Sequence, residues 1–218
     1  MGMARKHVAV LISGRGSNMT ALVEAARDKN YPAEIVLVVS NRPDAQGITY
    51  ARNAGIAITI IDHSDYGKDR EAFERALQAV LAGSGIEIVC LAGFMRVLTP
   101  WFIDRWQGRM LNIHPSLLPD FKGLHTHEHA IAAGAKTHGA SVHFVTADMD
   151  SGPIVCQAAV PVLAGDTAET LAARVLAVEH RIYPLALKWL AEGRLQITDG
   201  TCRLQGGHVP DGVSMPGA

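Results

Sequence analysis

The first half of the chain alternates apolar runs with amphipathic segments. The apolar runs lie at His7–Ser13, Glu34–Asn41, Ala57–Asp62 and Glu87–Phe94. Runs of this length that are apolar almost throughout are typical of strands buried on both faces of a parallel sheet. Between or after them, helical spacing of apolar residues occurs over Met19–Lys29, Gln46–Asn53, Lys68–Ala82 and Pro100–Trp106. The alternation predicts βαβ units and a mostly parallel, twisted sheet flanked by helices.

The second half has a different pattern. Met110–Pro119 carries prolines at two positions and favours an extended start, while Ala130–Ala135 predicts a short helical piece. Gly139–Thr146 and Pro153–Val162 predict an antiparallel hairpin. Leu171–Trp189 then has the spacing of one long amphipathic helix.

Two details of that long helix also follow from the sequence. Asp166 and Glu169 have the spacing of a capping box, with Asp166 as the N-cap. Pro184 lies inside the helix and should kink it, because proline removes a backbone donor and clashes with the preceding turn.

The length of 218 residues fits one large domain or two small ones, and we expect a single domain over residues 1–218. Within it we expect an N-terminal phosphate-binding half at 1–109, a catalytic half at 110–200 and a tail at 201–218. The tail is rich in glycine and proline from Gly206, and we expect it to be loosely held.

Composition removes several classes of function. Twenty basic and 21 acidic residues give a net charge of -1, so neither nucleic acid nor a membrane is an expected partner. No run of about 18 apolar residues predicts a membrane span. Three cysteines without CxxC spacing do not form a disulfide framework, and Cys90 and Cys156 have the apolar neighbours of core residues. We therefore expect a cytoplasmic protein.

A glycine loop follows the first predicted strand. Gly14, Gly16, Ser17 and Asn18 lie between that strand and a helix, where backbone N–H groups converge on an anion. Ser17 and Asn18 are also good N-cap residues. The loop is neither GxGxxG nor a P-loop, so a single phosphate monoester is the ligand that it favours. The alternative is a plain strand–helix turn.

Asn112 and His114 are two residues apart, so an extended backbone points both side chains to one face. An amide N–H can stabilise an oxyanion, and an imidazole can carry a proton near neutral pH. The pair suits acyl-group chemistry without a covalent intermediate. Its alternative is a hydrogen-bonded polar pair at a strand end.

Two acids lie in the loop of the predicted hairpin, Asp148 and Asp150. Either could be a turn residue, or could partner His114 and favour its charged form. His125, His127 and His129 suggest a metal site, but they lack the HExxH spacing, and no metal is expected. The loop Phe94–Pro100 is unusually apolar, which fits either a wall for a flat aromatic ligand or a segment that caps the core.

Taken together, these motifs resemble the folate-dependent glycinamide ribonucleotide formyltransferase family. The resemblance runs from about Val8 to about Leu195 and implies a Rossmann-like formyltransferase fold. The motifs that carry it are Leu11–Asn18, Leu91–Arg96, Asn112–Pro119, Gly123–His127, His138–Val145 and Asp150–Pro153. The Asn-x-His pattern is shared by wider folate enzymes, and the N-terminal glycine loop is the more specific mark.

The resemblance implies an activity, which is formyl transfer from 10-formyltetrahydrofolate to the amine of glycinamide ribonucleotide in purine synthesis. It implies catalytic roles for Asn112, His114 and Asp150, with Asp150 tuning His114. The substrate-binding residues that it implies are Gly16, Ser17, Asn18 and Glu179. The folate contacts that it implies are Arg70, Met95, Arg96, Val97, Leu98 and Asn112. One departure is Ser151, where the family often has glycine.

The small-molecule partners are therefore expected to be glycinamide ribonucleotide and formyl-folate, bound to a monomer or a homodimer. Three other classes of protein could also account for some of these motifs. They are other folate enzymes on the same core (a tRNA formyltransferase or a formyl-folate hydrolase), a non-catalytic phosphate binder that uses the glycine loop, and a metal hydrolase that uses the histidines. Glu179 and His180 lie in the middle of the long helix, and the alternative to the role implied for Glu179 is that both are surface residues.

Overall fold

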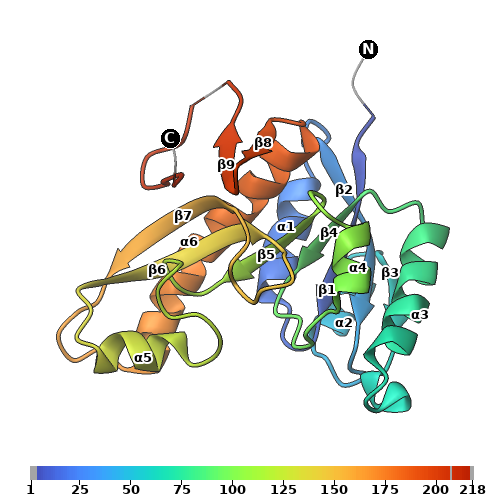
Figure 1. Ribbon diagram of the computed structural model, residues 1–218, viewed down its shortest axis with the longest axis horizontal. Helices are drawn as coiled ribbons and strands as arrows, with labels where there is room; N and C mark the ends of the chain where they lie inside the picture. The colour runs from blue at the N-terminus through green and yellow to red at the C-terminus, as the bar shows by residue number, and fades with distance from the viewer. Residues whose placement is uncertain (1–3, 207, 217–218) are drawn as a thin grey trace. The chain divides into compact units, whose positions relative to one another are not determined.

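The computed structural model describes residues 4–206 and 208–216. The chain divides into two compact units, Met1–Leu111 and Asn112–Ala218. Each unit is described by itself below, with the element labels of Figure 1.

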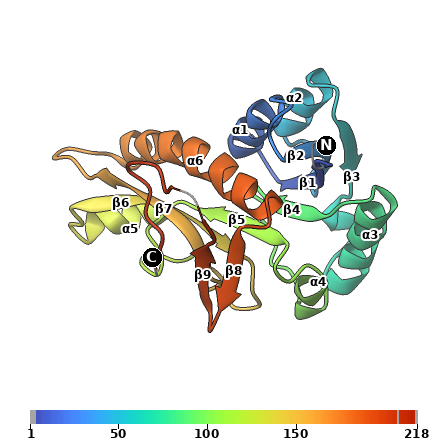
Figure 2. The ribbon, with the colours of Figure 1, turned by 90° about the horizontal axis from the view of Figure 1, so that it is seen from above.

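The first unit is built from βαβ repeats. Its strands are β1 (Lys6–Ile12), β2 (Ala33–Ser40), β3 (Ala57–Ile60) and β4 (Ile88–Leu91), and β5 (Met110–His114) begins at its end. Its helices are α1 (Ser17–Ala26), α2 (Gly47–Asn53), the short 3-10 helix η1 (His63–Tyr66), α3 (Arg70–Gly83) and α4 (Pro100–Arg105). Strand β1 pairs in parallel with β2 and β4, and β2 with β3. Figure 2 shows α1 and α2 on one face of these strands and α3 and α4 on the other.

Burial explains why these residues form strands. Val8, Ala9, Val10, Leu11 and Ile12 are 0% exposed, because helices cover both faces of the strand that they form. Parallel strands covered in this way need apolar residues at successive positions rather than at alternate ones.

The second unit contains the hairpin. Its elements are the end of β5, α5 (Thr126–Ala132), β6 (Thr137–Phe144), β7 (Ile154–Pro161), α6 (Ala168–Ala191), β8 (Leu195–Thr198) and β9 (Thr201–Leu204). Strands β6 and β7 are antiparallel, and so are β8 and β9. The long helix α6 packs on β6 and β7, as Figure 2 shows, and buries Leu171, Val175 and Ile182.

The predicted fold class is confirmed. The strands of the main sheet follow the order β3-β2-β1-β4-β5-β6-β7, with a separate β8-β9 pair. Strand β1 is therefore central and pairs with strands on both sides. As is usual in open parallel sheets, the loops after β1 and β4 leave one edge. Among the described residues, no helix is long and apolar enough to cross a membrane.

Several local predictions were wrong. Helix α6 is capped by Thr167, not Asp166, and its capping box pairs Thr167 with Thr170. Asp166 instead accepts hydrogen bonds from Leu163 N and from the Arg174 guanidinium. Helix α5 starts at Thr126, earlier than the apolar spacing indicated. Glu179 is a buried residue of α6, so its interpretation as a surface residue was also wrong.

The tail is held more firmly than its composition indicated. Ser214 exchanges two backbone hydrogen bonds with Gln157 of β7, at 2.8 and 2.9 Å, and Met215 is buried. This bridge covers part of an edge strand, whose backbone groups would otherwise lack partners.

Candidate active site

The predicted site residues fall into two groups, one in each unit. Gly16, Ser17, Asn18, Arg70 and the loop Met95–Leu98 belong to the first unit, and Asn112, His114, Asp150 and Glu179 to the second. The geometry within each group is given in turn.

The glycine loop in the first unit turns sharply into α1. Gly16 is the N-cap of the helix, with a φ of 73°, and a Cβ there would meet the Cα of Gly47 at 3.1 Å. Both observations require glycine. Ser17 and Asn18 occupy the first two helical positions, so the prediction that they cap the helix was wrong. Gly16, as the N-cap, makes no side-chain cap hydrogen bond, and the N-terminus of a helix suits an anion.

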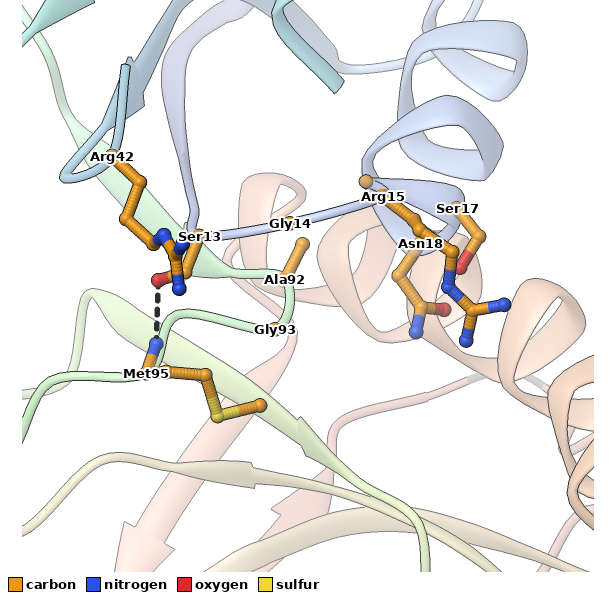
Figure 3. A pocket seen from close by; sticks show the side chains of 10 residues that line it. Ser13, Gly14, Arg15, Ser17, Asn18, Arg42, Ala92, Gly93 and Met95 are labelled. Carbon is orange, nitrogen blue, oxygen red and sulfur yellow. Dashed lines mark hydrogen bonds between the residues drawn. The ribbon is translucent and has the colours of Figure 1, made fainter. Parts of the chain in front are cut away.

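A pocket opens at this loop. Residues of the loops that follow β1, β2 and β4 line it: Ser13, Gly14, Arg15, Gly16, Ser17, Asn18, Arg42, Ala92, Gly93 and Met95. Figure 3 shows the side chains of Arg15, Ser17 and Asn18 beyond Gly14, with Ser13 and Met95 on its other side. The Ser13 hydroxyl accepts a 2.7 Å hydrogen bond from Met95 N and donates a 2.6 Å bond to Asn41 Oδ1.

Arg42 is the second cation of this pocket. Its guanidinium forms a bidentate pair with Asp44 at 2.9 and 3.0 Å, which raises the pKa of Arg42 and lowers that of Asp44. Much of its charge is therefore balanced locally. A phosphate in the pocket would depend chiefly on backbone N–H groups, on Ser17 and on Arg15, the other cation of the lining.

The apolar loop after β4 is anchored at both ends. Ser13 holds Met95 N, and the buried carboxylate of Glu74 accepts hydrogen bonds from Thr99 N and the Thr99 hydroxyl. Between these anchors Met95 is 69% exposed and Val97 is 48% exposed, while Leu98 is buried. The loop thus presents apolar side chains and backbone groups outward, as a wall for a flat ligand requires.

Arg96 and Arg70 differ in their environments. The Arg96 guanidinium lies 4.6 Å from the ring centroid of Phe73, and its Nε and Nη2 are buried without a hydrogen-bond partner among the described residues. Arg70 is exposed at the first position of α3. These two nitrogens could bind a carboxylate only if the Arg96 side chain moved to expose them.

In the second unit, Asn112, His114 and Asp150 meet. His114 Nδ1 lies 3.5 Å from Asp150 Oδ2, and the two side chains are 6% and 10% exposed. The Asp150 carboxylate also accepts a 3.0 Å hydrogen bond from Gly123 N. His114 Nε2 lies 2.9 Å from the carbonyl of Phe121, so this nitrogen carries a proton. The other acid of the loop, Asp148, is exposed, and no side-chain contact to the histidines is observed for it among the described residues.

His143, from β6, joins this cluster, and no role was predicted for it. Its Nδ1 lies 2.8 Å from Phe144 O and therefore donates, which leaves Nε2 as an acceptor. That nitrogen accepts from Asn112 Nδ2 at 3.1 Å. Burial lowers the pKa of His143, so the ring is neutral near pH 7 and this pattern is stable. In the sequence, His143 lies in the predicted strand Gly139–Thr146 and in the motif His138–Val145, and neither pointed to a role for it.

This arrangement fixes the Asn112 amide. One of its N–H bonds is held by His143, and the second remains available at the face that it shares with His114. The chemistry that results combines an oriented amide donor with an imidazole beside a carboxylate. Such a set can stabilise an oxyanion and transfer a proton.

Four more histidines of the second unit contact one another in two pairs. His138 Nε2 lies 3.2 Å from His127 Nδ1, and burial lowers the pKa of both, that of His138 to about 4. His125 and His129 form an edge contact at 6.5 Å. Within the described part of the chain, no group of three or more His, Cys, Asp or Glu residues could hold a metal ion. Glu179 is buried in α6, and its predicted substrate contact stays a prediction.

Comparisons with known proteins identify the family. The pattern of the formyl transferase family matches residues 6–187. Phosphoribosylglycinamide formyltransferase of Escherichia coli is 45% identical over 94% of this chain and 96% of its own length. The crystal structure of glycinamide ribonucleotide transformylase 1 from Symbiobacterium toebii has a TM-score of 0.90 and 46% identity, over 93% of this chain and 95% of that one.

A longer relative also matches. The trifunctional purine biosynthetic protein adenosine-3 of Homo sapiens is 49% identical over 88% of this chain, which spans only 19% of that protein. The resemblance to formyltransferases is therefore confirmed over most of the sequence, and the chain belongs to the formyl transferase family.

Proposed function

We propose that the protein transfers the formyl group of 10-formyltetrahydrofolate to the amine of glycinamide ribonucleotide, as a step of purine biosynthesis. The observation that carries this proposal is the cluster of Asn112, His114 and Asp150. The activity named for its full-length relative supports the choice of substrate. A non-catalytic phosphate binder would have no need for this cluster.

The reaction that fits the cluster is a direct attack of the amine on the formyl carbon. The attack places negative charge on the formyl oxygen, and the second N–H of the Asn112 amide would stabilise it. Because His143 already holds the amide in place, little reorganisation is needed when the charge develops.

His114 would supply the positive charge and the proton. Its Nε2 is committed to the Phe121 carbonyl, so the proton that can move is the one on Nδ1, next to Asp150. The 3.5 Å separation from Asp150 Oδ2 exceeds that of a good charged hydrogen bond and leaves the Nδ1 proton free to reach a third atom. That proton would pass, directly or through water, to the folate nitrogen as its bond to the formyl carbon breaks, and the proton lost by the attacking amine would restore His114.

Substrate binding would use the other predicted residues. The N-terminus of α1, with Gly16, Ser17 and Asn18, would bind the phosphate of the ribonucleotide, and Glu179 would contact its glycinamide part. Phosphate binding far from the reacting atoms would position the amine. Arg70 and the loop Met95–Leu98 would bind the folate, and the unsatisfied nitrogens of Arg96 would reach its carboxylates only if that side chain moved.

The decisive experiment follows the deformylated folate by absorbance, with and without glycinamide ribonucleotide. Formation of product that requires the ribonucleotide is expected. Equal formation in its absence would identify a formyl-folate hydrolase instead, and no formation in either case would refute the proposal. Gel filtration of the same preparation distinguishes a monomer from a homodimer.

A further inference from the structure

The loop that carries Asp150 is fastened at two adjacent points in the second unit. Gly123 N donates a 3.0 Å hydrogen bond to Asp150 Oδ2, and Lys122 Nζ donates a 2.6 Å bond to Ser151 Oγ. The Ser151 hydroxyl in turn donates to Met149 O at 2.9 Å. Two successive residues thus hold two successive residues of the other loop, and we call this set of contacts the 122/151 clasp.

One side of the clasp is firmly anchored. The loop after β5 is tied to β6 and β7 through Ser141, whose hydroxyl donates to Ser116 O at 2.7 Å and accepts from Leu118 N at 3.0 Å. Gln157 adds a 2.9 Å bond to Leu118 O. Because these contacts are buried or half-buried, the loop is a stable base for Lys122 and Gly123.

Apart from the clasp, the Asp150 loop is held at its base, where it joins β6 and β7. Phe144 N donates to Pro153 O at 2.9 Å, and Gly152 lies so close to Phe144 that a Cβ would approach its carbonyl oxygen to 1.8 Å. Asp150 has a φ of 49°, and Met149 is 58% exposed. Among the described residues, the hydrogen bonds and ion pairs from the side chains of this loop to the rest of the unit lie at Asp150 and Ser151. The position of the carboxylate therefore depends on them.

Lys122 also adds charge to the active site. Burial is the main cause of the lowered pKa of His143, and the exposed ammonium of Lys122 opposes protonation of the ring to a smaller extent. Around His114 lie the charged or titratable groups Asp150 and His143, with His127 and His138 within electrostatic range. Lys122 carries a permanent positive charge whose effect reaches His143. Ser151 provides the hydroxyl that Lys122 binds, which a glycine could not do.

We propose that Lys122 and Ser151 are positioning residues, which hold the Asp150 loop over His114 and place a fixed positive charge beside the pair. This inference rests on the proposed function, because it assigns Asp150 to catalysis. Neither residue needs to touch a substrate. Ser151, the departure from the family pattern, gains a specific role through its bond to Lys122.

The experiment compares Ser151→Ala, Lys122→Met, the double variant and Lys122→Arg, with Lys29→Met as a control on an exposed lysine outside the site. Each of the first two should lower kcat by roughly three- to tenfold, the range for loss of one hydrogen bond. The double variant should be no slower than the slower single variant, since both remove the same bond. Lys122→Arg should recover most of the rate.

A pH profile distinguishes the effect of the Lys122 charge from the effect of its hydrogen bond to Ser151. Removal of a cation favours protonation of every nearby group, so Lys122→Met should shift both limbs of the kcat/KM profile to higher pH by roughly half a unit, and less at high salt. Lys122→Arg should leave the limbs in place. Independent, multiplicative rate losses, or a Lys122→Met profile that coincides with that of the wild type, would overturn the proposal.

Amide hydrogen exchange tests the 122/151 clasp independently of enzyme activity. Residues 146–152 should exchange faster in Ser151→Ala than in the wild type, and equal rates would overturn the proposal. This readout keeps the two hypotheses apart. A wild type that fails to transfer formyl groups refutes the proposed function, whereas unchanged exchange and rates in the variants of an active enzyme refute only the positioning role.

Discussion

Replacement of Asp150 by Asn removes one charge from the active site with little change in shape. Asn tolerates the left-handed backbone that Asp150 adopts at a φ of 49°, and its carbonyl oxygen can still accept from Gly123 N at the 3.0 Å that Oδ2 occupies. The loop should therefore fold as before. The change tests the electrostatic contribution of the carboxylate and little else.

The magnitude follows from the geometry. Two unit charges 3.5 Å apart interact by roughly 5 kcal/mol at an effective dielectric constant of about 20. Desolvation of a carboxylate that is only 10% exposed offsets part of this. If about 3–4 kcal/mol remains in the transition state, Asp150→Asn should lower kcat by roughly 10²- to 10³-fold.

The assay is steady-state formyl transfer, monitored by absorbance of the deformylated folate, with thermal unfolding as a check of the fold. Asp148→Asn is the matched control, because Asp148 is an exposed carboxylate of the same loop. It should change kcat less than twofold, in line with ordinary surface substitutions. An Asp150→Asn enzyme that keeps a third or more of the wild-type kcat would refute the electrostatic role.

Three further predictions concern other parts of the molecule. Ser17→Ala should raise KM for the ribonucleotide more than it lowers kcat, because the loop binds a part of the substrate that does not react; a fall in kcat alone would contradict this. His143→Ala should lower kcat by roughly ten- to a hundredfold, since the Asn112 amide loses its acceptor at 3.1 Å, and unchanged kcat would show that the amide needs no anchor. Burial lowers the pKa of His138 from 6.5 to about 4, so the unfolded chain binds a proton before the folded chain does as pH falls. The free energy of unfolding, measured with urea, should therefore fall by about 1–3 kcal/mol between pH 6.5 and pH 4. His138→Gln should weaken this dependence on pH.

The sequence predicted the elements better than their ends. Strands buried on both faces, such as Val8–Ile12, are apolar throughout, so their pattern is unambiguous. Caps depend on single hydrogen bonds, and Thr167 and Asp166 are both plausible cap residues. The structure resolves the choice because Arg174 holds the Asp166 carboxylate.

The cluster of side chains at the candidate site was predicted in part. Asn112 and His114 are neighbours in one strand, so their shared face follows from the backbone, and the resemblance indicated Asp150. The role of His143 depends on its contact with Asn112, which lies 31 positions away in the sequence, and on the neutral state that burial enforces. The Lys122–Ser151 bond likewise joins two loops, and no local pattern reports such a contact.

We propose that His114, together with Asn112 and Asp150, acts in the chemical step of formyl transfer and not in the binding of substrates. The most direct test is kcat and substrate affinity for His114→Ala, with dissociation constants for the ribonucleotide and a folate analogue measured by calorimetry. We expect the kcat of His114→Ala to be lower by roughly 10²- to 10⁴-fold, the usual contribution of a general acid. Both dissociation constants should stay within about threefold of the wild-type values. A His114→Ala enzyme with near wild-type kcat, or one whose lost activity is matched by lost binding, would contradict this proposal.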